Sequence, residues 1–484
     1  MMPVSALPSK YGIGSLGEGA YLFVDFLKSA GQKYWQVLPL VQTGYGDSPY
    51  QSCSDRAGNP YFIDLEILHR KGLLTKRELQ KNIDKSPKID YGKLYGERYT
   101  ALRLAFSRFD VENDGFTRFV NSGKYADYAC FMALKQKFSA PFYEWPEEYK
   151  RRDARAMKKF RLENAEEILF WQFLQYEFYD QWTKLKKYAN GKGVKIIGDL
   201  PLYVAADSVD AWVEQSVFLL DEDLRPVKVA GVPPDYFCED GQLWGNPVYD
   251  YSRQSENGYK WWKSRLKHAL SVYDYVRIDH FRGLDRFWSV NAGSPDARGG
   301  EWVKAPGEKI FEGFDARNII AEDLGVIDDG VISLLERTGF PNMKVLEFAF
   351  GGDFKNPYLP WNVRENCVYY TGTHDNDTVL GFLESADDNF RKTIEKQVAD
   401  CLEYLEIYRT ATGKYAVAEA FQDIVYASRA DVAILPMHDV LFLGSEYRIN
   451  CPGTVGNWTV RYRKRLFTET AAQLLRRKAR RYER

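Results

Sequence analysis

Residues 275–283, with the sequence Tyr-Val-Arg-Ile-Asp-His-Phe-Arg-Gly, combine a short apolar strand with a charged cluster and a glycine turn. Because side chains alternate along a strand, Arg277 and Asp279 share one face. An arginine so close keeps a carboxylate ionised through charge-assisted hydrogen bonds. An ionised carboxylate at a strand end is suited to act as a nucleophile or an electrostatic stabiliser. The alternative is a structural ion pair where the strand enters a loop.

Acidic residues follow three further predicted strands in the same way: Asp199 in Gly-Asp-Leu-Pro, Glu322 in Ala-Glu-Asp-Leu-Gly and Asp375 in Thr-His-Asp-Asn-Asp. On the shared rim of a βα barrel these carboxylates would crowd together and raise one pKa, which leaves a protonated acid beside an ionised base. Cleavage of a glycosidic bond requires such a pair. Taken singly, Glu322 is also suited to cap a helix, and Asp375 to form a turn or bind a divalent metal. The recurrence at matching positions favours catalysis.

Two histidines, His280 and His374, adjoin these acids, and we predict that they donate hydrogen bonds to sugar hydroxyls. Structural hydrogen bonds are the alternative. The five histidines show no His-x-x-x-His or Cys/His spacing, so no metal is expected. The chain also has no P-loop lysine motif and no glycine-serine nucleophile elbow.

The pattern Gly12-x-Gly14-x-x-Gly17 formally matches the dinucleotide-binding fingerprint. A polar break separates it from the preceding strand, and the next strand ends in Leu-Pro-Leu without the acid that binds a ribose. The pattern therefore predicts no nicotinamide or flavin site.

Residues 229–250 are too long and too aromatic for a simple connection. We predict a substrate-covering loop in which Tyr236, Gln242 and Trp244 clamp a sugar chain and exclude water. The alternative is a structured surface loop with its aromatic side chains tucked down.

The elements that must position these residues alternate between strand and helix. Strands are predicted at residues 1–7, 34–41, 194–200, 275–278, 318–321, 343–348, 367–371 and 432–435. Helices are predicted at residues 18–30, 166–188, 259–272, 329–338, 386–408 and 414–427. Eight strands, most separated by a helix and followed by long loops, predict an α/β fold of the (β/α)8 TIM barrel type with helical and loop insertions.

One barrel domain is expected to span residues 1–484. Residues 66–162 carry short, highly charged helical patterns and predict a helical subdomain inserted into the barrel, with a capping box at Thr75–Glu78. The basic stretch from Arg461 onwards predicts an exposed closing helix.

The composition narrows the class of protein. Lys plus Arg (66) nearly balance Asp plus Glu (67), so no nucleic acid or anionic membrane is expected as a partner. The 15% of aromatic residues suits a protein that stacks on sugars, and it equally suits a large aromatic core. The six scattered cysteines, without paired spacing, and the lack of a secretory signal predict a cytoplasmic protein, or a stromal one if it comes from a plant. The oligomeric state is not indicated.

Several longer motifs span nearly the whole chain. They are Leu7-Pro8-Ser9-x-Tyr11-Gly12-Ile13-Gly14, Ser48-Pro49-Tyr50-Gln51-Ser52, Gly198-Asp199-Leu200-Pro201, Gly231-Val232-Pro233-Pro234-Asp235, Arg277-Ile278-Asp279-His280-Phe281-Arg282, Ala321-Glu322-Asp323-Leu324-Gly325, Gly372-Thr373-His374-Asp375-Asn376 and Asn450-x-Pro452-Gly453-Thr454. With these motifs the chain resembles the amylomaltases, which are 4-α-glucanotransferases (disproportionating enzymes) among the α-amylase-related barrels.

The resemblance implies a retaining transfer between α-1,4-glucans and malto-oligosaccharides, as in starch, glycogen or maltodextrin metabolism, without a cofactor. It implies that Asp279 is the nucleophile, Glu322 the general acid/base and Asp375 the transition-state stabiliser. It places Arg277, His374, Asp199, Tyr50 and Trp244 around the donor sugar, with Gln242 and Asn450 as further contacts. Retention predicts that the carboxyl groups of Asp279 and Glu322 lie about 5–5.5 Å apart.

The chain departs from the family pattern in two places. It begins at Met-Met-Pro-Val-Ser-Ala instead of a longer apolar strand, which predicts either a short first barrel strand or a trimmed start, with an effect on stability more than on chemistry. Around residues 340–348 a more usual glycine and glutamine are replaced, and Glu347 adds a charge near a strand end that is expected to alter substrate contacts.

Two other functions fit parts of this pattern. An α-1,4-glucan hydrolase would release glucose from maltotriose without redistributing chain lengths. A non-catalytic glucan-binding protein would use the aromatic residues for stacking, but it would need no acid on three separate strand ends.

Overall fold

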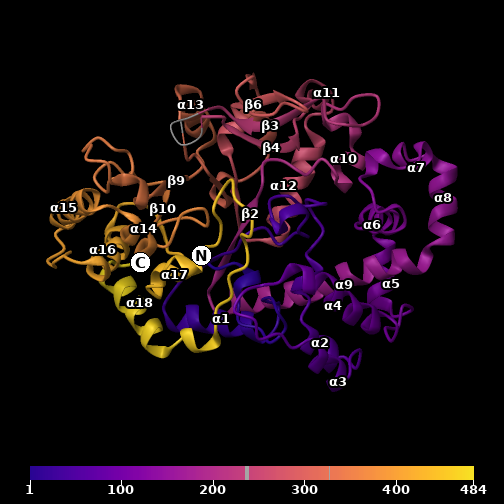
Figure 1. Cartoon of the computed structure of the whole chain (residues 1–484), viewed down its shortest axis with the longest axis horizontal. Helices are drawn as coiled ribbons and strands as arrows, with labels where there is room; N and C mark the ends of the chain where they lie inside the picture. Colours follow the sequence, from indigo (N-terminus) through magenta and orange to yellow (C-terminus); the bar gives the residue numbers. More distant parts are fainter. Residues whose placement is uncertain (235–238, 326) are drawn as a thin grey trace.

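The computed structural model describes residues 1–234, 239–325 and 327–484; residues 235–238, which include Tyr236 of the predicted covering loop, and residue 326 lie outside the described residues. The core is a ring of parallel strands in two arcs, which confirms the predicted TIM barrel (Figure 1). The first arc has the order β1-β2-β5-β8, with β1 (Tyr34–Gln36), β2 (Lys195–Leu200), β5 (Tyr275–Ile278) and β8 (Ile319–Ala321). The second has the order β11-β10-β9, with β9 (Asn342–Val345), β10 (Cys367–Tyr370) and β11 (Val432–Ile434).

The two arcs are joined by backbone hydrogen bonds. At one junction Ala321 N donates to Pro341 O (2.9 Å), which links β8 to β9. At the other, the start of the chain lies between β11 and β1: Met2 N donates to Gln36 O, and Met437 N donates to Met1 O, both at 3.0 Å. A short extended segment therefore takes the eighth position of the barrel.

The prediction of a strand at residues 1–7 is wrong. Val4–Ala6 forms a 3₁₀ turn, and only the first two residues lie along the neighbouring strands. Proline explains the difference, because Pro3 has no N–H group to donate to a strand partner and Pro8 restricts the residue before it.

The register of the first arc aligns the acidic strand ends. Asp199 of β2 pairs with Arg277 of β5, and Ile278 of β5 pairs with Ala321 of β8. The residues that directly follow, Asp279 and Glu322, therefore leave neighbouring strands at the same rim of the barrel.

Long helices surround the strands, and several begin or end where the pattern predicts. The helix predicted at residues 386–408 is present but shorter, from Asp388 to Tyr404, because Ala386 is extended and the Asp387 side chain caps the helix by accepting from Asn389 N and Phe390 N. The preceding helix, α14 (Val379–Ser385), was not predicted. The predicted closing helix begins only at Glu469 and buries Ala472, Leu475 and Ala479. The surrounding helices are α1 (Glu18–Ser29), α9 (Ala165–Gly191), α12 (Lys260–Val272), α13 (Asp329–Thr338), α14 (Val379–Ser385), α15 (Asp388–Tyr404), α16 (Lys414–Ala427), α17 (Met437–Val440) and α18 (Glu469–Arg481).

The helices between β1 and α9 extend to one side of the barrel, opposite α14–α18 (Figure 1). The capping box at Thr75 is confirmed. Arg98 is fully buried and donates to Tyr61 O, Ile63 O and Tyr11 O, so its guanidinium ties this group of helices to the barrel loops. The helices are α2 (Leu65–Arg70), α3 (Lys76–Lys81), α4 (Tyr91–Phe106), α5 (Asp114–Asn121), α6 (Ala126–Phe138), α7 (Glu147–Lys150) and α8 (Ala154–Glu163).

The segment predicted as a long loop at residues 229–250 contains two antiparallel strands, β3 (Lys228–Val232) and β4 (Gln242–Pro247). They belong to a second sheet of order β4-β3-β6-β7 with β6 (Arg286–Asn291) and β7 (Glu301–Lys304), and α10 (Val209–Val213) and α11 (Tyr251–Glu256) flank this region in the chain. The sequence pattern did not predict these strands, because a register shift between Val229 and Gly231 interrupts the alternation of side chains between the two faces of the sheet. Glycine is required at position 231, since a Cβ there would lie 2.3 Å from Gln242 O.

Among the described residues, no helix is long and apolar enough to cross a membrane.

Candidate active site

Arg277 is the centre of a buried ionic cluster. Its Nη1 lies 2.8 and 2.9 Å from the two carboxylate oxygens of Asp199, and 2.9 Å from Asp279 Oδ1. Its Nη2 lies 3.9 Å from Glu322 Oε2. One guanidinium thus faces three carboxyl groups from β2 and from the ends of β5 and β8. Arg277 and Asp279 pair as the strand alternation predicts, and Asp199 joins them through the β2–β5 register.

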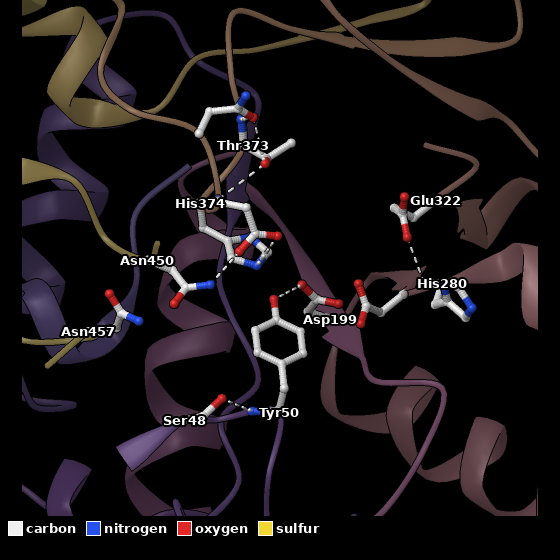
Figure 2. Close-up of polar contacts among 12 residues, drawn as sticks. Ser48, Tyr50, Asp199, His280, Glu322, Thr373, His374, Asn450 and Asn457 are labelled. Atoms are coloured by element: carbon white, nitrogen blue, oxygen red, sulfur yellow. Dashed lines mark hydrogen bonds and ion pairs between the residues drawn. The ribbon is translucent and has the colours of Figure 1, made fainter. Parts of the chain in front are cut away.

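Tyr50 extends this cluster towards the second arc. Its hydroxyl donates to Asp199 Oδ2 at 2.8 Å (Figure 2). Its ring stacks on the imidazole of His374, with ring centroids 5.1 Å apart and planes at 13°. The side chain of Tyr50 therefore connects the donor-site residues predicted on the two arcs.

Glu322 is buried at the end of β8 and is held by main-chain donors. His280 N donates to Oε2 at 2.6 Å (Figure 2). Leu324 N donates to Oε1 at 2.9 Å. Burial raises the pKa of Glu322 to about 7, against the lowering effect of Arg277 and with a further increase from the charge of Asp279. A carboxyl group with this pKa can give and take a proton near neutral pH.

His280 adopts a left-handed backbone conformation with φ 49°, and this turns its N–H towards Glu322. Its ring meets the ring of Trp244 edge-on, with centroids 4.8 Å apart. Burial lowers the pKa of His280 to about 4, so the imidazole is neutral near pH 7. Its Nε2 is buried without a hydrogen-bond partner among the described residues, which leaves it available to a sugar hydroxyl.

Asp375 follows β10 and is supported mainly by neutral groups. Asn450 Nδ2 donates to Oδ1 at 2.6 Å, and His374 Nε2 lies 3.4 Å from Oδ2 (Figure 2). Arg448 contacts only the backbone carbonyl of Asp375, at 2.9 Å. The side chain keeps 46% of its surface exposed, so its carboxylate can reach a ligand.

A cavity of about 760 Å³ opens over these residues. Three of the predicted site residues, Asp199, Arg277 and Glu322, do not line this cavity. Each of them contacts a residue that does: Asp199 contacts Tyr50, Arg277 contacts Asp279, and Glu322 contacts His280. The other predicted residues all line it: Tyr50, Gln242, Trp244, Asp279, His280, His374, Asp375 and Asn450. The structure therefore brings every predicted site residue to one place.

Other lining residues were missed by the sequence reasoning. Gln51 Nε2 donates to Trp244 O and to Asn246 Oδ1, both at 3.0 Å, and so ties the Tyr50 loop to β4. Residues 452–458 form a further wall, and the ring of Trp458 lies beside those of Tyr50 and His374. Gln51 and residues 452–454 belong to two of the sequence motifs given above, so those motifs could have identified them as site residues.

A second cavity of about 800 Å³ lies beside the first and shares Gln51 with it. It opens between the barrel and the inserted helices. Its aromatic lining comes from α4, α6, α9 and the segment after α6: Tyr95, Tyr99, Phe131, Tyr143 and Trp171.

In the described part of the chain, no group of three or more His, Cys, Asp or Glu side chains is arranged to hold a metal ion. The arrangement offers an ion-paired carboxylate, a carboxyl group that titrates near pH 7, and a half-exposed carboxylate, all from neighbouring loops.

Comparisons with known proteins agree with this geometry. Residues 2–467 match a family model described as 4-alpha-glucanotransferase. The chain is 46% identical over 495 residues to a 4-alpha-glucanotransferase of Clostridium butyricum, covering 100% of both chains. It is 43% identical over 475 residues to one of Streptococcus pneumoniae, covering 95% of this chain and 92% of the relative. Among solved structures, an amylomaltase from Streptococcus agalactiae in complex with acarbose superposes with a TM-score of 0.93 at 38% identity, covering 100% of this chain and 98% of that chain.

Proposed function

The chain belongs to the 4-alpha-glucanotransferases of glycoside hydrolase family 77, retaining transglycosylases, and we propose that Asp279, Glu322 and Asp375 carry out its reaction. Its substrates under this proposal are α-1,4-glucans and malto-oligosaccharides. The observation that carries the assignment is the geometry of three carboxyl groups at one rim of the barrel. Asp279 and Asp375 line the same cavity, while Asp279 and Glu322 face the same buried guanidinium of Arg277.

In the first half-reaction, Asp279 attacks the anomeric carbon while Glu322 gives its proton to the leaving glycosidic oxygen. Arg277 Nη1 lies 2.9 Å from Asp279 Oδ1 and orients this carboxylate. The pKa of Glu322, about 7, supports its role as the acid. The C–O bond to the leaving sugar breaks, a glycosyl–Asp279 ester forms, and the shortened sugar departs.

In the second half-reaction, Glu322 is a carboxylate and takes the proton from the 4-hydroxyl of an acceptor sugar. That oxygen attacks the anomeric carbon, the ester bond to Asp279 breaks, and the original anomer is restored. Asp375 stabilises both oxocarbenium-like transition states through the ring hydroxyls. Its exposed carboxylate, held by Asn450, supports this role.

The donor sugar is placed by the residues that line the cavity. The stacked rings of Tyr50 and His374 form one aromatic wall. The rings of Trp244 and His280, which meet edge-on, form another. Gln242 accepts a hydrogen bond from Trp244 Nε1 at 3.3 Å, so both side chains of the β3–β4 hairpin face the same space. The similarity to the amylomaltase from Streptococcus agalactiae in complex with acarbose supports α-glucans as the substrates.

Longer glucans have room to extend. The second cavity adjoins the first at Gln51 and presents aromatic faces, on which the C–H faces of sugar rings can pack. We infer that chains too long for the first cavity continue along it. The hairpin of β3 and β4, through Trp244, covers the reacting bond and favours an acceptor sugar over water.

Incubation with maltotriose tests the reaction class. Transfer produces glucose together with maltopentaose and longer chains. Glucose and maltose without longer chains would instead support the hydrolase. Glucan binding without turnover would support the non-catalytic binding protein.

A trapping experiment tests the two carboxylates. In Glu322→Gln, α-maltosyl fluoride still reacts with Asp279, because fluoride leaves without a proton, but no base remains to activate an acceptor. We expect the protein mass to rise by one maltosyl group. The matched control, Glu322→Gln/Asp279→Asn, should show no adduct; labelling of this double variant, or none of the single one, would contradict the assignment.

The described cysteines bear on location. Cys130, Cys367 and Cys401 are free and buried, as is typical of proteins in reducing compartments. This supports a cytoplasmic location, or the stroma for a plastid protein.

A further inference from the structure

One side of the substrate cavity is formed by the segment that follows β2, which we call the β2 wall. Its three residues, Pro201, Leu202 and Tyr203, all line the substrate cavity. Pro201 and Tyr203 also line a smaller cavity of about 40 Å³, whose lining includes Asp55 and Arg265. Because space adjoins the β2 wall in both cavities, it lacks part of the packing that fixes a buried segment. Its position must depend on polar contacts.

The side chain of Arg265 binds all three carbonyl groups of the β2 wall. Its Nη1 donates to Leu202 O at 2.8 Å, and its Nη2 donates to Pro201 O at 2.6 Å and to Tyr203 O at 3.5 Å. The hydroxyl of Tyr249 donates to Leu202 O as well, at 2.7 Å. Since a guanidinium presents five N–H donors in a rigid plane, one side chain can fix three consecutive carbonyl groups.

The position of Arg265 is set by groups outside the substrate cavity. Its side chain is 2% exposed, and its guanidinium carbon lies 5.3 and 5.0 Å from the ring centroids of Trp261 and Trp262. Its Nε lies 3.2 Å from Asp55 Oδ2, and the side chain of Asp55 is 1% exposed. A buried guanidinium requires such a counter-charge. Arg265 is therefore held in place whether or not a sugar is bound.

The ion pair with Asp55 connects the β2 wall to the segment that carries Tyr50. Asp55 N donates to Asp210 Oδ2 at 2.9 Å, which attaches this segment to α10. Tyr50 itself donates to Asp199 of β2 at 2.8 Å. Two contacts thus fix the distance between the Tyr50 side of the cavity and the β2 wall: this hydrogen bond and the ion pair of Asp55 with Arg265.

We propose that Arg265 is a positioning residue for the donor glucan, which keeps the β2 wall in its binding conformation by holding the three carbonyl groups. Arg265 does not line the substrate cavity, so it acts through the β2 wall alone. The proposal rests on the assignment of this cavity to the donor glucan. Without Arg265, the β2 wall would have to be ordered when the sugar binds, and this cost weakens binding.

The kinetic test compares two arginines that are both 2% exposed. Arg265→Lys keeps the charge but replaces the planar fork by one ammonium group. Arg98→Lys is the matched control, because Arg98 also donates to three carbonyl groups, none of them on a residue that lines the substrate cavity. We expect KM for maltotriose to rise about tenfold in Arg265→Lys and to change less than about twofold in Arg98→Lys. A loss of folded protein alone would lower the apparent kcat and leave KM unchanged.

Binding without turnover gives a second readout. In the Asp279→Asn background, the Kd of maltotriose measured by calorimetry should rise by the same factor on addition of Arg265→Lys, but not on addition of Arg98→Lys. Unchanged KM and Kd in Arg265→Lys would overturn the positioning role alone. Absence of transfer from maltotriose by the unmodified enzyme would instead overturn the proposed function.

A milder substitution keeps the proposal testable if Arg265→Lys does not fold. Tyr249→Phe removes one donor to the β2 wall and should raise KM for maltotriose about two- to threefold. Its control is Tyr369→Phe, which removes a buried hydroxyl that donates to Tyr358 O; neither residue lines the substrate cavity, so KM should not change. The same KM in these two variants would contradict the dependence of sugar binding on the carbonyl contacts of the β2 wall.

Discussion

The two arcs of the barrel support their acidic residues in different ways. In the arc β1-β2-β5-β8, Asp199, Asp279 and Glu322 share the buried guanidinium of Arg277. In the arc β9-β10-β11, the side chain of Asp375 contacts an amide and an imidazole. The first arrangement controls which groups carry a proton. The second controls where a half-exposed carboxylate lies.

The difference teaches how one site can hold carboxylates with different tasks. A buried charge cluster raises the pKa of one member near neutrality, and this suits proton transfer. A carboxylate that only grips hydroxyl groups needs exposure and orientation instead. Substitutions in the first arc should therefore change protonation or folding, and those around Asp375 in the second arc should change the rate without changing the pH profile.

The substitution with the largest expected effect is Asp279→Asn, which removes the proposed nucleophile of the first arc and keeps the shape of the side chain. We expect the transfer rate from maltotriose to fall by about 10⁴-fold or more. The urea unfolding midpoint should remain close to that of the unmodified protein, because the side chain is partly exposed. A variant that transfers at a near-normal rate would remove Asp279 from its assigned role.

Removal of the shared cation should damage folding in the first arc. In Arg277→Met, the carboxylate of Asp199 loses its buried partner, and breaking a buried pair costs about 3–5 kcal/mol. Urea unfolding measures this loss. Arg429→Met is the matched control, because its ion pair with Glu365 is exposed on both sides and should change the stability by less than about 1 kcal/mol. Equal effects of the two substitutions would contradict the central place of Arg277.

The pH dependence of kcat/KM tests the role of the charge cluster around Arg277. Since Glu322 must be protonated in the first half-reaction and its pKa is about 7, kcat/KM for a glucan donor should fall about tenfold per pH unit above pH 7. With α-maltosyl fluoride, whose leaving group needs no proton, this limb should disappear. Identical profiles for the two donors would argue against Glu322 as the acid.

The second arc should give the smallest effect. Asn450→Ala removes one hydrogen bond to the carboxylate of Asp375, and a bond to a charged group is worth about 1.5–3 kcal/mol. We expect transfer to slow about tenfold to 100-fold, with the apparent pKa near 7 unchanged. A shift of that pKa would show that the two arcs are not separate in their electrostatics.

The sequence predicted the fold and the site where the signal was local. The acids at 279, 322 and 375 each follow a recognisable strand, and Asp199 lies near the end of one. The helices α13 and α16 have the predicted bounds. The contact of Arg277 with Asp199 depends on the register of β2 and β5, which no local pattern specifies. The β3–β4 hairpin was missed because a shifted register and glycines hide its alternation. Glu347 lies in a 3₁₀ turn after β9 and does not line the substrate cavity, so the predicted change in substrate contacts has no direct route.

The left-handed backbone of His280 has a consequence for the reaction geometry. It lets the residue next to Asp279 hold Glu322 through a main-chain N–H group, so β5 and β8 are clamped together where their carboxyl groups emerge. This main-chain contact fixes the proposed acid/base relative to the proposed nucleophile without using the side chain of Asp279 as a tether. The loops above can therefore diversify in their choice of sugars without disturbing the pair.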